Sequence, residues 1–433
     1  MNLKYAFQSV IALHQEEMPW KLYDRLQTLP INTQQIVTVT GVRRCGKSSL
    51  LALTINRLLQ KGVKREQIVY IGFDDERFSN MGLDNFDEIL QAYREMHPTL
   101  ALKEAYLFFD EIQLIKGWEL FVLRVYKNYC KNIYITGSTA QMLSAEMSSA
   151  LRGWPDEYKE YPLCFKEFLD FKGIKANAYT EQGAAILSKA VWEYLREGGF
   201  PQVVLAPNES DRTKLLQSYF NTMLFRDLIE HYNLSTAAST LRYFLKRVMN
   251  NLTKPTSINS IYNDIKSQGL KVSKDSLYLW LDYACNIFLF YKLPRYSQSI
   301  VKQNAALAKY YVADFALLRA NLLPQSDENG KALENAVFLK LLHEQCHNDQ
   351  LFYFSEGAEC DFVVVRQTKV VQLIQVCWEL NAENELREFR GLEVAAQATQ
   401  CNQVKVITHN QQYTRQQGNL NIDIVPAWKF LLN

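Results

Sequence analysis

Residues Gly41–Ser48 read GVRRCGKS, and this stretch decides the fold. It fits the phosphate-loop pattern of a glycine, four residues and then Gly-Lys-Ser. The β-branched run Gln35–Thr40 precedes it, and the helical pattern KSSLLALTINRLLQKG (47–62) follows it. A phosphate loop belongs between a strand and a helix, because its N–H groups and the positive helix end then face the same phosphates. The stretch therefore predicts a P-loop domain of the α/β class.

The side chains of this Walker A loop have separate expected roles. Lys47 reaches the β- and γ-phosphate oxygens of ATP, and the hydroxyl of Ser48 binds Mg²⁺. Arg43 and Arg44 are expected either to brace phosphates or to remain solvated. The residues that we expect to bind ATP are Gly41, Arg43, Arg44, Cys45, Gly46, Lys47, Ser48 and Ser49.

Two acidic residues end a later apolar run, as in a Walker B motif. Asp110 closes the run Tyr106–Phe109, and Glu111 follows it. We expect Asp110 to hold Mg²⁺ beside the phosphates and Glu111 to deprotonate the attacking water. At the end of the next run, NIYITGS, Ser138 is expected to sense the γ-phosphate. A simple strand-end turn at Gly137 explains the same residues.

Short apolar runs alternate with helical patterns between Ile36 and Ser138, which predicts a parallel sheet covered on both faces. Residues 163–250 are mostly helical in pattern. Residues 257–296 read as two helices, the second capped by Ser273, and then an aromatic strand pair, the layout of a winged helix. We expect a P-loop core with a helical lead-in over 1–160, a helical lid over 161–250, a winged helix-turn-helix over 251–304 and an α/β domain over 305–433.

The composition excludes several classes of protein. The 433 residues are 48% hydrophobic and carry a net charge of +2, which implies no strong overall attraction to nucleic acid. No apolar run approaches the roughly 18 residues of a membrane span. The eight cysteines are dispersed without a CxxC pair, which argues against a zinc ribbon or a disulfide framework. We expect a cytoplasmic protein without a membrane partner.

Further motifs accompany the phosphate loop: FDDERF (73–78), FFDEIQLIKGWE (108–119), ITGSTAQML (135–143), PLCFKEFL (162–169) and GGFPQVV (198–204). With GVRRCGKSSLL, this set resembles a large group of prokaryotic AAA-type P-loop ATPases that carry a C-terminal domain of poorly understood role. The resemblance covers essentially the whole chain. It implies an AAA+ type core, a helical lid, a winged helix and a restriction-endonuclease-like C-terminal domain.

One position departs from the pattern of this group. Its members usually have Gly-Arg after the sensor segment, whereas this chain has Gly153-Trp154. Arg152 and Arg226 are the candidates for an arginine that acts on the γ-phosphate. An ordinary surface arginine is the competing interpretation of Arg226.

The resemblance also implies a second site in the C-terminal domain. Endonucleases of the restriction type hold Mg²⁺ with carboxylates and position water with a lysine. The corresponding positions are Glu334 on a helix, Asp361 at the opening of a strand and Gln375 on the next strand. Gln375 replaces an acid and Cys377 replaces the lysine, so the fold is implied while the reaction is left open. A domain that binds DNA or a partner without cutting is the alternative.

Residues 343–347, HEQCH, spell the zinc-protease signature H-E-x-x-H. On a helix, His343 and His347 would share a face and could bind zinc, with Glu344 as the base. The segment stands at the end of its helix, and no third ligand is evident. We therefore expect a solvated helix end and not a zinc site.

Together these patterns predict a Mg²⁺-dependent switch that binds and hydrolyses ATP and rearranges the winged helix and the C-terminal domain. The alternatives are an ATP-dependent DNA-binding protein or nuclease, and a regulatory module that holds ATP without hydrolysis. Lysines near the winged helix suit DNA phosphates, but the helical segment SKDSLYLWLDYACN is rich in aromatics and suits docking equally well. DNA, a protein partner and a nucleotide-dependent homo-oligomer are all left open as partners besides ATP and ADP.

Overall fold

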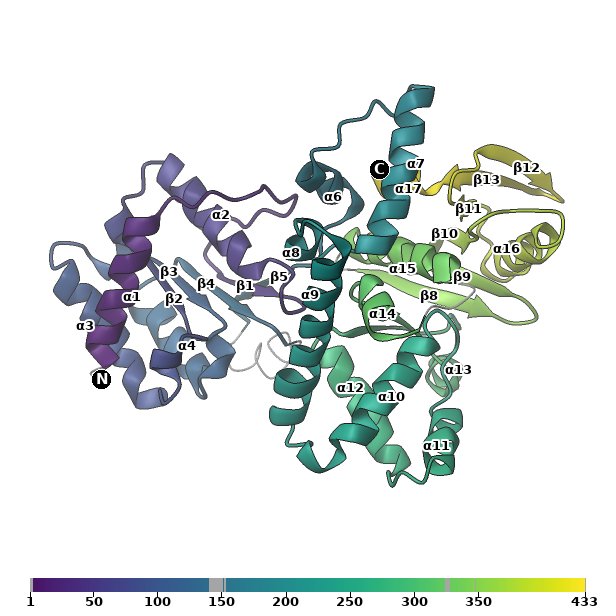
Figure 1. Ribbon diagram of the computed structural model, residues 1–433. Coiled ribbons are helices and arrows are strands. Elements are labelled where there is room, and N and C mark those ends of the chain that lie inside the picture. Colours follow the sequence, from purple (N-terminus) through teal and green to yellow (C-terminus); the bar gives the residue numbers. More distant parts are fainter. Residues whose placement is uncertain (1–2, 140–150, 152, 324–327, 347, 433) are drawn as a thin grey trace. The chain divides into compact units, whose positions relative to one another are not determined.

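The computed structural model describes residues 3–139, 151, 153–323, 328–346 and 348–432. These residues divide into two compact units, Met1–Tyr161 and Pro162–Asn433, each with its own sheet (Figure 1). Within the described ranges, no helix combines the length and the apolar character that crossing a bilayer requires.

The first unit is built on a five-stranded sheet in which all neighbouring strands are parallel. In the order in which they lie side by side, the strands are β2 (Ile68–Gly72), β3 (Tyr106–Asp110), β4 (Ile133–Gly137), β1 (Ile36–Thr40) and β5 (Pro155–Lys159). Every residue of β1, β3 and β4 is buried, which explains their mostly apolar sequences. Because the strands are parallel, the segments that follow them meet at one edge of the sheet.

Helices cover both faces of this sheet. They are α1 (Leu3–Glu17), α2 (Lys47–Gln60), α3 (Phe86–Met96) and α4 (Trp118–Asn128). Leu107 and Phe109 of β3 belong to the core formed with α1, α3 and α4, whereas Tyr106 and Phe108 belong to the core formed with α2. Successive residues of the strand thus pack on opposite faces of the sheet, as the pleat requires.

The parallel sheet predicted from the sequence is confirmed, but strand β5 was not predicted. Its sequence, PDEYK, is mostly polar, and none of its residues is buried. It lies at the edge of the sheet beside β1, where a strand needs no apolar face. Its pairing brings Glu160 next to the loop after β1, since the Glu160 N–H donates to the carbonyl of Thr40 at 2.7 Å.

The second unit begins with a run of helices, in agreement with the expected pattern. They are α6 (Phe165–Lys172), α7 (Glu181–Glu197), α8 (Pro201–Val204), α9 (Glu209–Thr222), the π-helix η7 (Met223–Glu230) and α10 (Ala238–Asn250). The hydroxyl of Thr180 accepts the N–H of Gly183 and so caps the start of α7. Between α7 and α8, Gly198 adopts a φ of 84°, and the N–H of Gly199 donates to Asp314 at 2.6 Å.

Two further helices pack against α10 and lead to a strand. The elements are α11 (Ile258–Ser267), α12 (Lys274–Asn286), β6 (Phe290–Leu293) and α13 (Ile300–Ala305). The predicted cap of α12 is confirmed, because Ser273 Oγ accepts the N–H of Ser276 at 3.0 Å. The expected strand pair within 287–296 is wrong, since only β6 forms there. Pro294 ends it, and its partner is the later strand β7 (Lys309–Val312).

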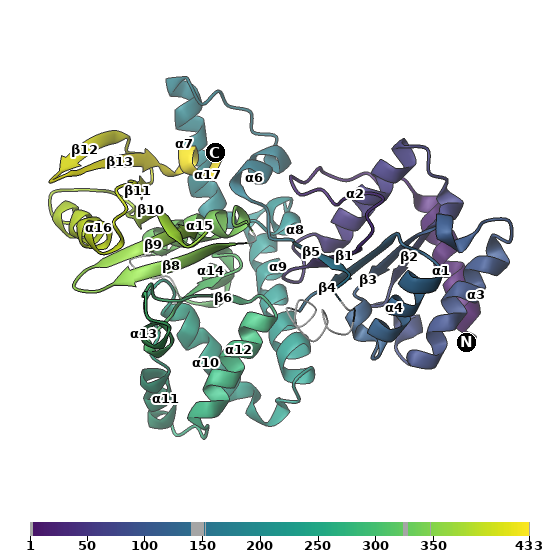
Figure 2. The ribbon, with the colours of Figure 1, turned by 180° about the vertical axis from the view of Figure 1, so that it is seen from behind.

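The rest of the second unit contains a six-stranded sheet in the order β12-β13-β11-β10-β9-β8. Its strands are β8 (Asp349–Ser355), β9 (Glu359–Arg366), β10 (Lys369–Val376), β11 (Val404–Thr408), β12 (Tyr413–Gln417) and β13 (Leu420–Pro426). Helix α16 (Glu385–Thr399) packs on the sheet through Phe389 and Leu392 (Figure 2). The other helices are α14 (Ala316–Asn321), α15 (Glu328–His343) and α17 (Ala427–Leu432). Strands β12 and β13 and helix α17 were not predicted.

Candidate functional site

The loop between β1 and α2 has the backbone shape that its glycines permit. Gly41 adopts a φ of 152° and Gly46 a φ of 117°, both in the region that favours glycine. A Cβ on Gly41 would lie 2.0 Å from the carbonyl oxygen of Glu160, so no other residue fits without a shift of the backbone. Helix α2 then begins at Lys47, and its positive N-terminal end faces the loop.

A buried arginine side chain from the N-terminal segment hydrogen-bonds to this loop. Arg25 donates through Nη1 to the carbonyl of Cys45 and through Nη2 to the carbonyl of Tyr161, both at 2.9 Å. Its Nη1 also lies 2.5 Å from Glu160 Oε1. Burial raises the pKa of the Cys45 thiol to about 11, so this expected ATP-binding residue stays protonated and donates to the carbonyl of Glu160.

Lys47 and Glu111 form an ion pair at the edge of the sheet. Lys47 Nζ lies 3.4 Å from Glu111 Oε1 and 3.1 Å from the carbonyl oxygen of Gly41. Burial alone would raise the pKa of Glu111, but Lys47 and Arg43, with hydrogen bonds from Gln113 and Ser138, outweigh it and lower the pKa to about 2. Burial alone would lower the pKa of Lys47, and its nearness to Glu111 raises it instead. Both groups are therefore charged at neutral pH.

Asp110 is held by hydroxyl groups from three directions. The hydroxyl of Tyr70, on the neighbouring strand β2, donates to Oδ2 at 2.7 Å, and the hydroxyl of Thr136, on β4, donates to Oδ1. The side chain of Ser48, an exposed residue at the start of α2, also lies near enough to this carboxylate to favour its charged form. Burial and the nearby Glu111 raise the pKa of Asp110. The structure thus brings Ser48 and Asp110 together, as the predicted metal site requires.

The carboxylate of Glu111 is oriented by two neighbours. Gln113 Nε2 donates to Glu111 Oε2 at 2.6 Å, and Ser138 Oγ donates to the same oxygen at 2.8 Å. Glu111 itself adopts a φ of 52°, a left-handed conformation that costs a non-glycine residue about 1–2 kcal/mol. Its N–H donates to Thr136 Oγ1 at 2.9 Å, which helps to hold that conformation. Ser138 therefore lies where it positions the expected base.

The remaining residues predicted for this site differ in placement. Arg44 is exposed and adopts a φ of 70°, and Ser49 is half-buried at the start of α2. Arg152, a candidate for the arginine that acts on the γ-phosphate, lies outside the described residues. Arg226, the other candidate, is exposed on η7 of the second unit.

The geometry of the first unit fits ATP and Mg²⁺. A buried ammonium stands at the turn of a glycine-bearing loop, where it can meet phosphate oxygens. Ser48, an exposed residue, and the nearby carboxylate of Asp110 offer the oxygen ligands that Mg²⁺ prefers. Glu111 supplies a carboxylate next to both of them.

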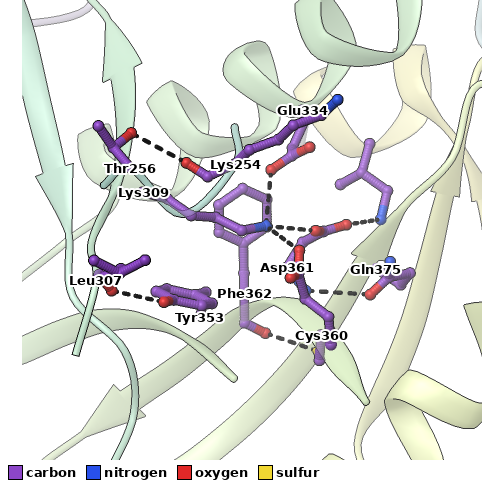
Figure 3. A network of polar contacts seen from close by, with 12 residues as sticks. Lys254, Thr256, Leu307, Lys309, Glu334, Tyr353, Cys360, Asp361, Phe362 and Gln375 are labelled. Atoms are coloured by element: carbon purple, nitrogen blue, oxygen red, sulfur yellow. Dashed lines mark hydrogen bonds and ion pairs between the residues drawn. The ribbon is translucent and has the colours of Figure 1, made fainter. Parts of the chain in front are cut away.

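Two of the three residues predicted for the second site, Glu334 and Asp361, lie together with a lysine that was not predicted. Figure 3 shows Glu334 of α15 and Asp361 of β9 on either side of Lys309, which comes from β7. Lys309 Nζ lies 3.0 Å from Asp361 Oδ1 and 3.4 Å from Glu334 Oε1. Gln375 joins these residues only through the backbone of Asp361, whose N–H donates to Gln375 Oε1 at 3.2 Å.

Among the described residues of the H-E-x-x-H segment, only His343 lies in a helix. Helix α15 ends at His343, so Glu344 lies beyond the helix. His347 lies outside the described residues. Among the residues that the structure describes, no group of three or more His, Cys, Asp or Glu side chains is arranged to hold a metal ion.

Comparisons with known families match two segments of the chain. The family described as "AAA domain" matches residues 33–169, which contain the loop, the acidic pair and Ser138. A domain of unknown function, DUF8612, matches residues 188–328.

Two curated proteins are similar over most of their length. The uncharacterized protein MJ1544 of Methanocaldococcus jannaschii is 32% identical over 421 residues, which cover 95% of this chain and 91% of that protein. An uncharacterized protein of Haemophilus influenzae is 30% identical over 354 residues, which cover 81% of this chain and 84% of that protein.

Among solved structures, the similarity is weak. The Aeropyrum pernix Orc1 protein in complex with DNA gives a TM-score of 0.28 at 14% identity, over 73% of this chain and 90% of that one. Cdc6p from Pyrobaculum aerophilum gives a TM-score of 0.26 at 12% identity, over 71% of this chain and 89% of that one.

Proposed function

This chain belongs to the family of AAA-domain proteins that includes MJ1544 of Methanocaldococcus jannaschii, and on that basis we propose that it is a Mg²⁺-dependent ATPase that acts as a nucleotide switch. One observation carries the proposal. The glycine-bearing loop, Lys47, the Ser48–Asp110 pair and Glu111 meet at the carboxyl edge of one parallel sheet.

ATP binding would begin with an exchange of partners by Lys47. Its ammonium pairs with Glu111 in the structure, and a triphosphate offers it more negative charge at the mouth of the loop. Asp110 and Ser48 would hold Mg²⁺, and the hydroxyls of Tyr70 and Thr136 would keep the Asp110 carboxylate aimed at it. The metal supplies the charge neutralisation that phosphoryl transfer needs.

The same exchange would activate Glu111. A carboxylate with a pKa of about 2 is a weak base, and its pairing with Lys47 is a main reason for that value. When Lys47 turns to phosphate, the pKa of Glu111 rises and its Oε1 becomes available to accept a proton from water. Ser138 and Gln113 retain Oε2 throughout, so the base keeps its orientation. Glu111 is therefore a weak base until nucleotide binds at the loop.

A path from the loop toward the second unit supports the switch role. Arg25 binds the loop at Cys45 and the chain at Glu160 and Tyr161, and Tyr161 is the last residue of the first unit. A change in loop conformation on ATP binding would therefore pull on the segment that enters the second unit. The role of the helices beyond it, including a lid and a winged helix, is part of this proposal.

The test is the rate of phosphate release by the full chain with ATP and Mg²⁺, measured beside the Lys47→Ala variant. Parallel measurements with and without DNA, and of the mass in solution with and without ATP, would identify a DNA or self-association partner. We expect phosphate release by the parent that Lys47→Ala abolishes. Stable ATP binding by the parent with no phosphate release would contradict hydrolysis and favour a static regulatory module.

A further inference from the structure

Lys309 is a buried lysine surrounded by three acidic side chains. Lys309 Nζ lies 2.8 Å from Glu359 Oε1, 3.0 Å from Asp361 Oδ1 and 3.4 Å from Glu334 Oε1 (Figure 3). The lysine is 0% exposed, and the three acids come from α15 and β9. Such a lysine is costly to bury, so its presence needs a compensating role.

The resemblance to restriction-type endonucleases implies a divalent metal at this place, but the residues do not fit one. Asp361 Oδ1 already accepts from Lys309, and its Oδ2 accepts the N–H of Val376 at 3.0 Å. Glu334 Oε1 lies beside Lys309 and also accepts the hydroxyl of Tyr311 at 2.8 Å. Both oxygens of Asp361 and Oε1 of Glu334 are thus engaged by donors of the protein.

The residue at the third metal-binding position of such enzymes also bonds to other partners in this chain. Gln375 Nε2 donates to Glu388 Oε2 at 2.7 Å, and its Oε1 accepts the N–H of Asp361. The Cys377 thiol, which stands where a lysine would position water, donates to the carbonyl of Glu379 at 3.1 Å. Neither side chain is directed to the carboxylates that Lys309 bridges.

We infer that the ammonium of Lys309 is the resident cation of this cluster and takes the place of a divalent metal, so that the cluster fastens β7, α15 and β9 to one another and does not cut DNA. Burial alone would lower the pKa of Lys309, but Glu334, Asp361 and Glu359 raise it well above its usual value, so the charge persists. An ammonium with three donors can serve three carboxylates at once. The ammonium pairs with these acidic side chains, but unlike a catalytic metal it offers no open coordination position.

The inference predicts how the cluster responds to Mn²⁺, a spectroscopic substitute for Mg²⁺ that prefers carboxylate ligands. In the nucleotide-free full chain, the parent and Asp361→Asn should bind the same number of Mn²⁺ ions, counted by electron paramagnetic resonance. The variant Lys309→Met should gain one Mn²⁺ ion, with an apparent Kd at least about tenfold below that of any site in the parent. The double variant Lys309→Met with Asp361→Asn should lose that ion again.

A matched lysine supplies the control. Lys340 lies on α15 and pairs with the half-exposed Glu344 at 2.9 Å, so Lys340→Met should bind no additional Mn²⁺. Loss of a Mn²⁺ ion from the parent in Asp361→Asn would overturn the inference, as would a folded Lys309→Met that gains none. If Lys309→Met does not fold, the comparison of parent with Asp361→Asn still decides. Glu359→Gln, whose side chain is 44% exposed, repeats that comparison with a milder change.

Discussion

Lys47 Nζ lies 3.4 Å from Glu111 Oε1, so the cation that should grip phosphate is paired with the acid that should activate water. The pair joins the start of α2 to the end of β3, two places that are 64 residues apart in sequence (111 − 47). Because each partner stabilises the charged form of the other, the site is stable without nucleotide and poorly basic at the same time. The predictions that follow begin from this pair.

Lys47→Ala should weaken ATP binding about 100-fold or more, since a buried charge-assisted contact to phosphate is lost. It should also raise the pKa of Glu111, whose main attractive partner disappears. Titration with a fluorescent ATP analogue measures the affinity. The control is Lys61→Ala, which changes an exposed residue just after α2. Its affinity for ATP should equal that of the parent.

Glu111→Gln should retain ATP binding and lose turnover by about 10²–10⁴-fold, because the amide cannot accept the proton of water. The amide still accepts a hydrogen bond from Ser138, so the local structure should persist. Single-turnover phosphate release measures the effect. Turnover equal to that of the parent would remove Glu111 as the base.

Tyr70→Phe should raise the Mg²⁺ concentration needed for half-maximal activity about threefold to tenfold, while the affinity for ATP without metal stays unchanged. The change removes only the hydroxyl that orients Asp110 Oδ2, a hydrogen bond to a charged group. Tyr158→Phe is the control, because its hydroxyl bonds to Asp156 on strand β5. Equal Mg²⁺ dependence in Tyr70→Phe and the parent would show that Asp110 needs no such support.

Asp314 should make the second unit more stable as the pH falls from about 6 to 4. Burial raises the pKa of this carboxyl to about 6, and the N–H groups of Ala316, Gly199 and Phe200 offset only part of that effect. The folded state then holds a proton that the unfolded state has lost, so this contribution decreases as the pH rises through the window. A shift of this size corresponds to roughly 3 kcal/mol in the free energy of unfolding.

The measurement is urea unfolding of the parent and of Asp314→Asn at pH values across that window. Asparagine does not titrate, so the free energy of unfolding of the parent should decrease relative to that of Asp314→Asn as the pH rises. A constant difference would show that Asp314 has an ordinary pKa.

Gly198→Ala should destabilise the second unit more than Gly173→Ala. Gly173 has φ 65° and ψ 23°, a left-handed conformation in which alanine costs about 1 kcal/mol. Gly198 has φ 84° and ψ −172°, a region that essentially only glycine adopts, so the backbone strain is larger there. At Gly198 the new Cβ would also lie 2.4 Å from Asp314 Oδ1, whereas nothing lies within 4 Å at Gly173. Equal thermal unfolding of the two variants would contradict this close approach.

The residues expected to bind nucleotide lie close together in the structure because their motifs stand at strand ends. The loop, Asp110 and Glu111 are recognisable from local spacing, and a parallel sheet brings such ends together. Tyr70 and Arg25 carry no comparable signal. Tyr70 reaches Asp110 only because β2 lies beside β3, and Arg25 reaches the loop only through the path of an irregular segment.

The second site shows the same limit more sharply. The resemblance to restriction-type endonucleases implies Glu334 and Asp361, yet it gives no signal for the lysine that lies between them. Lys309 lies on β7, which the sequence pattern did not show as the partner of β6. Gln113 is an intermediate case: it stands two residues after Glu111, where a polar side chain in an apolar stretch could have suggested contact with the base.

The hydrogen bond from Arg25 to the loop decides where a nucleotide-binding fragment of this chain can begin. The match to the AAA domain family starts at residue 33, so a fragment that begins there would lack this arginine. The buried carboxylate of Glu160 would then lack the guanidinium of Arg25, and the loop would lose the hydrogen bond at the carbonyl of Cys45. The minimal autonomous nucleotide-binding piece of this chain must therefore include the stretch ahead of the first strand.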